Sequence, residues 1–576
     1  MVLVDRYVRF EDELLAMIEE TGAVSFDESI EAVLNALPPC SSREEREDQE
    51  QRAMEAELIR YRAEVEEPAF AMLRDRKASR PPAMRKEPTT SAYYRQVLDG
   101  IDPRFPPLTG ASAVVNSLTI GMSWPPDDHL RSYPSAGFIS SCHDCFLVLY
   151  FGAYRPGIPS SPGCYLVLNT WANSVAIVPP LHTSFVTTRS HSGIGTGVAV
   201  LRHNDYFDYV LVELFRRQDS RTHLGSNKAT LFLWWSPDSG PLADGQWMQK
   251  EVLLPLPADD KEDDATPATY SFRADMVFAV STTSLCWVDL RTGILLCDHI
   301  DMLATDDDTS LVFRFIPLPE ECAMKPDPLS WGRPAEDFRT MRCMNSETII
   351  FVSMDGFIQG HPIGNTLLTT WTLKFPLADH WMWEKHPTPS LCVGDLLDDL
   401  PIILKKDDDK NKQLLIASRP VLSVDKGHLV THLTITEFEW KHEQGQWEAT
   451  GLYELSIDMY ARTVLELSSI GTQVFRCSQI FAADIGGLEQ TMAWEELQRR
   501  RPILEWPSRE EVVVDEDKYE WVFPEDLDKY LPIPAMSILC KGGIRKSTSY
   551  KEIVGASKGS NKIPMGLQCA LDYPEN

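Results

Sequence analysis

The amino-acid sequence predicts a mainly β protein, with a β-propeller-like body of repeated antiparallel sheets and an α-helical N-terminal extension. Three observations lead to this prediction. One apolar hairpin pattern recurs along the middle of the chain. Proline and tryptophan are frequent, with 40 and 15 residues, which favours short strands punctuated by turns over long helices. Helical spacing of apolar residues, by contrast, is found near the N-terminus.

Residues 1–75 are expected to form the helical extension. Apolar residues keep helical spacing from Asp5 to Glu20. Ser25 and Glu28 are spaced as a capping box that opens a second helix, and Pro38 ends it. We therefore expect two short helices before the chain becomes strongly charged.

A third, highly charged helix is expected from Ser42 to about Val65. Its apolar residues are few, namely Met54, Leu58 and Ile59. Such a helix is most simply a solvated one, and the alternative is that it contacts a partner.

Composition divides the rest of the chain into three parts. Residues 76–110 hold Pro81, Pro82 and Pro88 and are predicted to be a Pro-rich linker. Residues 111–490 are predicted to be the propeller-like β domain. Residues 491–576 are predicted to be a C-terminal extension of mixed helix and a disordered basic tail.

The clearest hairpin lies between Ser284 and Pro319. An apolar strand leads to a polar turn at Leu290 to Gly293, where the glycine can adopt a positive φ. A second apolar strand ends near Asp298, and a third, beginning near Phe313, ends on a proline. The stretch predicts three consecutive antiparallel strands.

Four other stretches repeat this plan. A hairpin unit that recurs every fifty to seventy residues or so is typical of radially repeated sheets, because each sheet buries its apolar face only against its neighbours. The alternative is a set of hairpins on unrelated sandwiches. The tryptophans of these strands are expected to pack between sheets, with one or two at loop edges as candidate partner anchors. The four stretches are Cys164–Pro180, Ala229–Pro257, Thr370–Glu384 and Leu433–Thr450.

Several of these runs resemble a plant family, domain of unknown function 1618, that is greatly expanded in grasses. The resemblance spans roughly residues 130–490, with a family core at about 273–420. It implies a plant protein with a propeller-like body similar to F-box-associated proteins, and a biochemical function that is not established for the family. It therefore supplies no catalytic residues. The runs that carry it are Cys286–Asp289, Gly293–Asp298, Ile316–Pro319, Trp371–Leu373, Tyr165–Asn169 and Gln246–Trp247.

An F-box itself is not evident. The Leu-Pro start and leucine-rich helix of an F-box are not matched by Phe10–Leu15. Leu37-Pro38-Pro39 leads instead into a charged stretch.

The formal net charge of −30 sets limits on partners and compartment. A strongly acidic surface repels phosphate backbones, so nucleic-acid and anionic-membrane binding are not expected outside a local basic patch. No signal-peptide core and no apolar run of about eighteen residues is present. The 12 cysteines are scattered, as expected for buried thiols in a reducing compartment. We expect a cytoplasmic or nuclear protein.

Two short motifs suggest cofactor chemistry at first sight. Cys142-His143-Asp144-Cys145 has thiol spacing suited to zinc, but a structural zinc site needs a second ligand pair, and none follows. We expect a turn that enters a strand. Gly193–Gly197 precedes a β-type run rather than a helix, so we expect a loop and no phosphate cradle. No metal or cofactor site is predicted.

Candidate groups for acid–base chemistry occur at His203, Asp205, Asp208 and Glu213. They are expected in a turn between two strands, and Asn-Asp sequences are ordinary turn chemistry. No nucleophile elbow, zincin pair or kinase motif set occurs. We predict no catalytic residue and no enzyme.

Charged runs complete the sequence. The acidic runs 259–264, 306–308 and 407–409 are expected in solvated loops that oppose edge-to-edge aggregation. Residues 541–562 carry scattered Lys and Arg in a Ser/Gly-rich segment.

The sequence thus predicts a non-catalytic protein-interaction module with an unknown protein partner and unknown oligomeric state. Two alternatives stay open. One is an enzyme with a diffuse polar site in the propeller channel, and the other is a nuclear regulatory protein that uses the basic C-terminal tail.

Overall fold

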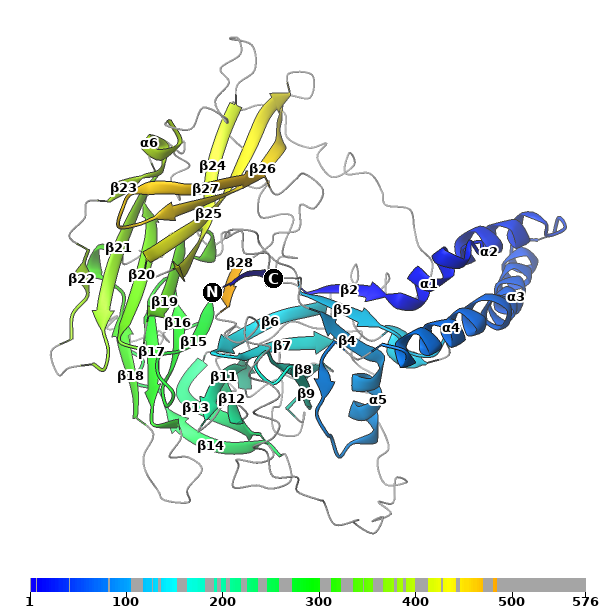
Figure 1. Cartoon of the computed structure of the whole chain (residues 1–576), viewed down its shortest axis with the longest axis horizontal. Coiled ribbons are helices and arrows are strands. Elements are labelled where there is room, and N and C mark those ends of the chain that lie inside the picture. The colour runs from blue at the N-terminus through cyan, green and yellow to red at the C-terminus, as the bar shows by residue number, and fades with distance from the viewer. Residues whose placement is uncertain are drawn as a thin grey trace. The chain divides into compact units, whose positions relative to one another are not determined.

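Antiparallel β-sheets make up most of the described structure, and helices lie at its N-terminal end (Figure 1). The computed structural model divides into two compact units, Met1–Thr491 and Met492–Asn576. All described residues belong to the first unit. They are residues 2–483 without 7, 41, 81–82, 105–117, 127, 133–135, 153–162, 182–190, 194–197, 204–207, 219–224, 237–245, 258–271, 301–311, 323–334, 345, 356–365, 378–380, 387–389, 399–412, 426–427, 442–445 and 470–479.

The N-terminal helices pack as antiparallel pairs. Helix α1 contacts α4, and α2 contacts α3. From Arg43 to Ala78 the chain is helical without a break, because α3, η1 and α4 follow one another directly. The helices are α1 (Glu13–Thr21), α2 (Phe26–Asn35), α3 (Arg43–Tyr61), the π-helical turn η1 (Arg62–Glu66) and α4 (Glu67–Ala78).

The predicted caps are confirmed, and the start of the first helix is corrected. The Ser25 hydroxyl accepts a hydrogen bond from Glu28 N, and the Glu28 carboxylate accepts one from Ser25 N, which is the capping box. Ser42 caps α3 by accepting from Glu45 N at 3.1 Å. The first helix begins at Glu13 rather than near Asp5, because residues 9–12 form a strand that pairs with Thr119–Met122.

The stretch 76–110, predicted to be a linker, contains regular structure. It includes the end of α4, β3 (Arg85–Lys86), α5 (Ala92–Gly100) and β4 (Ile101–Arg104). Val97 and Leu98 of α5 are buried in an apolar cluster with residues of the first sheet. Prolines here punctuate elements that pack on the body, because helix α5 carries enough apolar surface to bury.

Five antiparallel sheets follow in chain order. Within each of them the main strands pair in the order in which they occur in the sequence, as in a repeated meander. The first sheet has β6 (Ala136–His143), β7 (Phe146–Gly152), β8 (Cys164–Asn169) and β9 (Ser174–Val178), with β3 at its edge. The second has β10 (His191–Gly193), β11 (Ala199–His203), β12 (Asp208–Gln218), β13 (Gly225–Trp235) and β14 (Met248–Leu253).

The other three sheets repeat this order. The third has β15 (Met276–Ala279), β16 (Leu285–Asp289), β17 (Gly293–Asp298) and β18 (Val312–Pro317). The fourth has β19 (Arg339–Met344), β20 (Thr348–Asp355), β21 (Leu367–Lys374), β22 (Glu384–Lys385) and β23 (Leu391–Cys392). The fifth has β24 (Gln413–Asp425), β25 (His428–Lys441), β26 (Gln446–Asp458) and β27 (Thr463–Ser469).

Smaller elements connect these sheets. Strands β2 (Arg9–Asp12), β5 (Thr119–Met122) and β4 form a three-stranded sheet, and β1 (Val2–Asp5) pairs with β28 (Ile480–Ala483). Short helices are η2 (His129–Ser132), η4 (Glu320–Cys322), η5 (Ala335–Asp337) and α6 (Val393–Asp398).

Successive sheets share apolar cores. One cluster joins the first and second sheets, a second joins the second and third, and a third joins the third, fourth and fifth. Trp287 is 1% exposed and lies in the cluster between the second and third sheets. The predicted mainly β body of repeated antiparallel sheets is confirmed, and so is the packing of Trp234, Trp235 and Trp371 in its interior.

The predicted hairpins fall on real strands, with one shift. The stretch 284–319 forms β16, β17 and β18 in the expected register. In the fourth hairpin, pairing begins at Glu384 rather than at Trp381. Trp383 instead donates from Nε1 to Pro317 O at 2.8 Å and packs against the Phe351 ring. Its side chain therefore contacts both the third and the fourth sheet.

Candidate functional site

The first strands of the sheets come together around a cavity of about 290 Å³. Strand β6 contacts β11 and β15, β15 contacts β19, and β19 contacts β24. The cavity volume is at the lower end of the range for ligand pockets. Its lining residues are Arg6, Cys142–Asp144, Met276–Val280, Glu336, Arg339–Cys343, Ser346 and Arg419–Leu422.

The cavity is bordered by the edges of two strands, β15 and β19. Because side chains alternate between the two faces of a strand, an unbroken run of residues at a wall means that the strand edge faces the cavity. Met276–Val280 and Arg339–Cys343 are such runs. Strands β15 and β19 are end strands that pair on one side only among the described residues, with β16 and β20. Their other edges present backbone donors and acceptors to the cavity.

An ion pair joins the N-terminal segment to the cavity wall. Arg6 Nη1 lies 2.9 Å from Glu336 Oε1, and the two side chains are 7% and 22% exposed. Arg6 Nε also donates to Ile139 O, and its guanidinium lies 4.6 Å from the centre of the Phe138 ring. One residue thus contacts the first sheet and the start of the fourth.

Two further ion pairs lie at the cavity. Arg419 Nε is 3.2 Å from Asp337, which links the fifth sheet to η5. Arg419 has a φ of 56° at an irregularity in the pairing of β24 with β25. On the other side, Arg202 Nη1 is 2.9 Å from Asp144 Oδ2. The adjacent carboxylates of Glu336 and Asp337 in η5 therefore pair with Arg6 and Arg419, which are far apart in the sequence.

Burial shifts one carboxyl group beside the cavity. Asp275 precedes β15 and accepts a hydrogen bond from Leu290 N at 2.8 Å. Burial, reinforced by the neighbouring carboxylates of Glu336 and Asp289, raises the pKa of Asp275 to about 8. Asp275 does not line the cavity, so its carboxyl group is not placed to contact a ligand there.

The buried side chain of Arg339, at the start of β19, links the third and fourth sheets. Its Nη1 donates to Leu290 O at 2.8 Å and its Nη2 donates to Cys322 O at 2.6 Å. The guanidinium lies near the Phe338 and Phe351 rings. Burial lowers the pKa of Arg339, and the two carbonyl groups accept from two of its five N–H donors, while Nε is buried without a hydrogen-bond partner among the described residues.

The Cys142–Cys145 motif forms the end of β6 and the turn into β7, as predicted. Burial raises the pKa of Cys145 to about 12 and that of Cys343, also at the cavity, to about 11. Since the thiolate is the reactive and metal-binding form, neither sulfur is prepared for that chemistry near neutral pH. Within the described part of the chain, no group of three His, Cys, Asp or Glu is placed to hold a metal.

The other candidate residues lie away from the cavity. His203 and Asp208 pair across β11 and β12, as the predicted turn requires. Glu213 is buried and accepts a hydrogen bond from the Tyr165 hydroxyl at 2.9 Å, and burial raises its pKa to about 7. Asp205, residues 194–197, the three acidic runs and the basic tail lie outside the described residues.

A second polar cluster lies on the fifth sheet. His432 Nε2 is 2.7 Å from Ser423 Oγ, and Nδ1 is 2.9 Å from Ser456 Oγ and 3.3 Å from Glu454 Oε1. All four residues are buried, and none lines the cavity. The contacts satisfy both nitrogens of a buried imidazole. Sequence reasoning missed this cluster because only the strand register brings its members together.

Sequence reasoning also missed Arg6, Glu336 and Arg419. No spacing rule connects them, because residues 6 and 336 meet only when the whole β body is assembled. A weak signal was available in the pair Glu336-Asp337, two carboxylates in succession before a strand.

Comparison with known proteins gives one family match. The model of a family described as "Protein of unknown function (DUF1618)" matches residues 287–431, from the third sheet into the fifth. A search of curated proteins finds no match. No helix in the described residues is long and apolar enough to cross a membrane.

Some solved structures are distantly similar. The GH43 BlXynB protein from Bacillus licheniformis is 12% identical over 56% of this chain and 53% of its own, with a TM-score of 0.20. A thermostable family-43 glycoside hydrolase is 9% identical over 57% of this chain and 91% of its own, with a TM-score of 0.23. A GH32 β-fructofuranosidase from Bombyx mori is 11% identical over 56% and 82%, with a TM-score of 0.19. The chain spans about half the length of the first of these, and TM-scores this low carry no argument about activity.

Proposed function

We propose that this chain is a non-catalytic protein-interaction module that binds a short segment of a partner protein at the central cavity. The observation that supports it best is the pair of strand edges, β15 and β19, that border the cavity. An extended peptide can extend such an edge, with backbone hydrogen bonds supplying affinity and neighbouring side chains supplying selectivity. The cavity volume suits the tip of a partner segment.

The charged groups at the cavity are consistent with a structural role, in which they hold the strand edges in position for binding. Glu336 and Asp337 are each already engaged by an arginine. An ion pair that bridges distant segments holds the edges in place before a partner arrives, which reduces the ordering cost of binding.

The proposal includes closure of the five sheets into a propeller. Its support is the path of the N-terminal segment. Val8 N donates to Gly137 O at 3.1 Å and Ile139 N donates to Arg6 O at 2.8 Å, next to the pairing of β1 with β28. Strand β28 in turn contacts β24. This segment connects the first sheet to the fifth, and a closed ring leaves no sheet without a neighbour.

We also propose that the chain is a plant member of the matched family and works in the cytoplasm or nucleus. The family match at residues 287–431 and the shared motifs support the first part. The acidic composition and the scattered free thiols support the second. The nuclear alternative depends on residues 541–562, and their deletion tests it by the loss of nuclear accumulation.

The cavity is tested with displayed random peptides panned on the full chain. Ser346 is an exposed turn residue at the cavity with a φ of 55°, so Ser346→Trp should obstruct the opening, and any strain from a bulky residue at positive φ is matched in the control. Arg462→Trp is the matched control, since Arg462 is an exposed turn residue with a φ of 58° and does not line the cavity. We expect enriched peptides to bind the Ser346 variant at least about tenfold more weakly, and the control equally well. Equal binding to all three proteins, or no enrichment, would overturn the proposal.

A further inference from the structure

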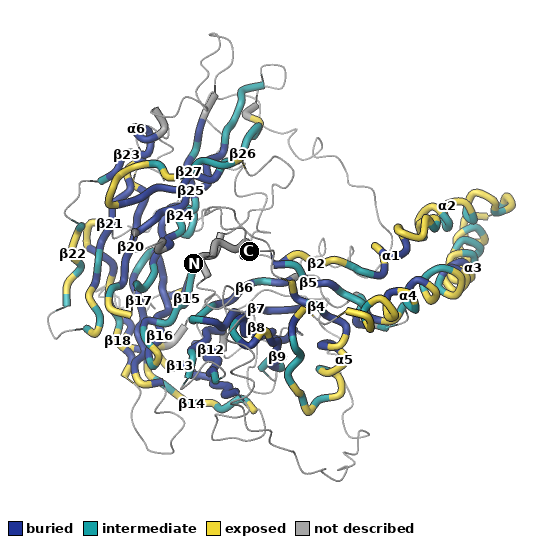
Figure 2. The backbone as a smooth tube through the Cα atoms, in the orientation of Figure 1, coloured by how far each residue is buried: buried dark blue, intermediate teal, exposed yellow. Residues whose placement is uncertain are grey.

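The N-terminal helices carry apolar side chains that the described fold does not bury. We call helices α1, α2, α3 and α4 with η1 the arm. Helix α2 contacts α3 yet contains no buried residue. In Figure 2 the arm is mostly exposed or intermediate along its length. Because the arm is only two helices thick, one side of each helix has no neighbour.

Three exposed apolar residues lie on α3, and a fourth lies beside it. Met54, Leu58 and Ile59 are 38%, 41% and 70% exposed, and Val24 is 58% exposed. Met54 and Leu58 are neighbours on the helix surface at i and i+4. Val24 is held beside the same helix, because its carbonyl accepts a hydrogen bond from the Tyr61 hydroxyl at 3.1 Å. These four residues are called the arm patch.

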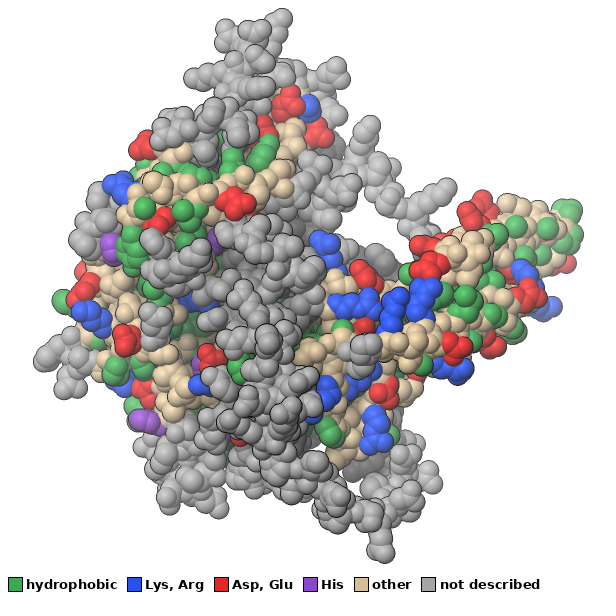
Figure 3. Space-filling view, viewed as in Figure 1, with side chains coloured by type: hydrophobic (Ala, Val, Ile, Leu, Met, Phe, Trp, Pro, Cys, Tyr) green, Lys and Arg blue, Asp and Glu red, His purple; other side chains and the backbone are tan. Residues whose placement is uncertain are grey.

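The surroundings of the arm patch are strongly acidic. Residues 13–78, which span the whole arm, contain 17 acidic and eight basic side chains, a net charge of −9. Each of these eight basic side chains already pairs with a carboxylate of the arm. Glu19, Glu31 and Glu44 have no ion pair among the described residues. Figure 3 shows acidic side chains interspersed with hydrophobic ones over the arm.

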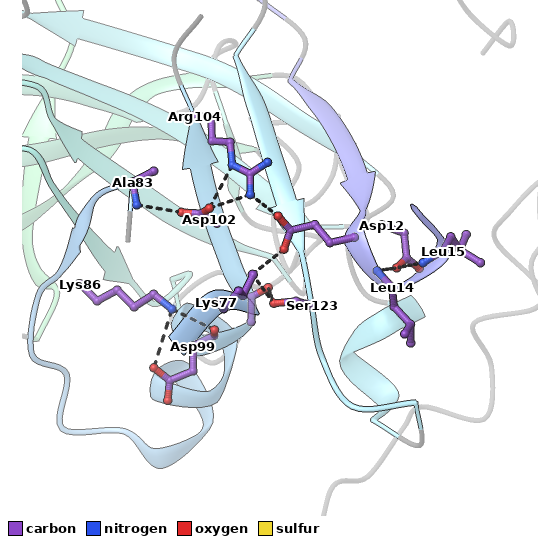
Figure 4. Close-up of polar contacts among 12 residues, drawn as sticks. Asp12, Leu14, Leu15, Lys77, Ala83, Lys86, Asp99, Asp102, Arg104 and Ser123 are labelled. Atoms are coloured by element: carbon purple, nitrogen blue, oxygen red, sulfur yellow. Dashed lines mark hydrogen bonds and ion pairs between the residues drawn. The ribbon is translucent and has the colours of Figure 1, made fainter. Parts of the chain in front are cut away.

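The arm is fixed at its base. Glu13 at the start of α1 pairs with Lys77 of α4 at 2.5 Å and with Arg104 of β4. Lys77 also donates to the Ser123 hydroxyl, and Arg104 pairs with Asp102 (Figure 4). A surface attached in this way loses less conformational entropy when a partner binds.

We propose that the arm is a docking surface for a basic amphipathic helix of a partner protein. Apolar residues at helical steps match the ridges of a second helix laid alongside. Charge selects the partner: the arm of a second copy of this chain would bring a net charge of −9 against −9, whereas flanking Lys and Arg would meet the carboxylates that have no ion pair among the described residues. This docking surface is separate from the cavity, and the proposal does not depend on it.

The test uses the full chain and two synthetic peptides of about 20 residues with the same leucine face, one with lysine flanks and one with glutamate flanks. Fluorescence anisotropy should show binding of the lysine peptide only, weakened as salt rises. The double variant Leu58→Ser with Ile59→Ser should lose at least about tenfold in affinity. The matched control, Leu253→Ser with Met382→Ser, removes residues that are 71% and 68% exposed on the β body and should bind as the wild type does.

A second pair of variants tests the charges. Glu31→Gln with Glu44→Gln, at two of the carboxylates that have no ion pair in the described part of the chain, should reduce affinity several-fold and flatten the salt dependence, while Glu347→Gln with Glu384→Gln on the body should not. Helical circular dichroism confirms that each variant is folded. Unchanged binding by the Leu58/Ile59 variant would overturn the proposal, because attraction to the acidic surface in general would then account for the affinity. Equal binding of the glutamate peptide, or self-association through the arm in sedimentation, would also overturn it.

Discussion

At the scale of single residues, the most consequential group near the cavity is Asp275. Its carboxyl group has a pKa of about 8 in the folded chain, against 3.8 for an ordinary aspartate. Between these two values the folded chain holds a proton that the unfolded chain has released. Stability contributed by this group is therefore fully present below about pH 4 and is lost as pH rises towards 8.

Asp275→Asn should remove this dependence on pH. The amide is neutral at every pH, and its oxygen can still accept the hydrogen bond from Leu290 N. We expect the Tm of the variant to be close to wild type at about pH 4, and to exceed it increasingly as pH rises to about 8. Thermal unfolding across this range measures the difference, with Glu384→Gln at an exposed position as the control. Parallel curves for wild type and Asp275→Asn would contradict the assigned environment.

Single residues also show where sequence reasoning succeeds. Ser25 and Glu28 could be predicted as a cap because their partners are each other's backbone groups, three positions apart. Arg6 could not, since its partner Glu336 is 330 positions away and nothing local depends on it. Contacts between residues a few positions apart can be predicted from the sequence, whereas contacts between distant residues depend on how the sheets assemble.

At the scale of elements, hairpins were predictable because apolar strands and polar turns alternate within a short window. The third sheet follows the predicted pattern from Leu285 to Pro317. Strand ends were less predictable. Trp381 and Trp383 have high strand propensity, yet pairing begins only at Glu384, because the rings pack between sheets instead of joining a ladder.

The capping box of α2 yields a prediction at this scale. Ser25→Ala removes one acceptor from the first turn, at a cost of about 1 kcal/mol. Because α2 has no buried residue, this loss should appear as local opening rather than as global unfolding. Amide hydrogen exchange in α2 should accelerate about fivefold.

The control for this prediction is Ser79→Ala. The Ser79 hydroxyl donates to Arg76 O at the end of α4, so its loss should leave exchange in α2 unchanged. If Ser25→Ala left exchange in α2 unaltered, the cap would contribute nothing and α2 would depend on its contact with α3 alone.

At the scale of the whole unit, the repetition of sheets was predictable and the way in which they are tied together was not. Apolar faces that need neighbours predicted that each sheet packs against the next, and the clusters between successive sheets confirm this packing. The N-terminal segment was predicted to be helical, yet it pairs with strands from both ends of the described chain. Its short strands have weak sequence signals because their hydrogen bonds are made to distant partners.

The ion pair of Arg6 with Glu336 allows a test of this connection. Arg6→Ala would leave Glu336 without its cation in a site where both side chains are largely buried. We expect a loss of about 2 kcal/mol in the free energy of unfolding, below the value for a fully buried pair because Glu336 keeps some solvent contact. Urea unfolding of Arg6→Ala, Glu336→Ala and the double variant should give a coupling energy of about 1–3 kcal/mol. Arg43 and Glu47, whose side chains are 93% and 63% exposed, form the control cycle and should show no measurable coupling. Additive losses for Arg6 and Glu336 would mean that the N-terminal segment lies on the β body without holding its first and fourth sheets together.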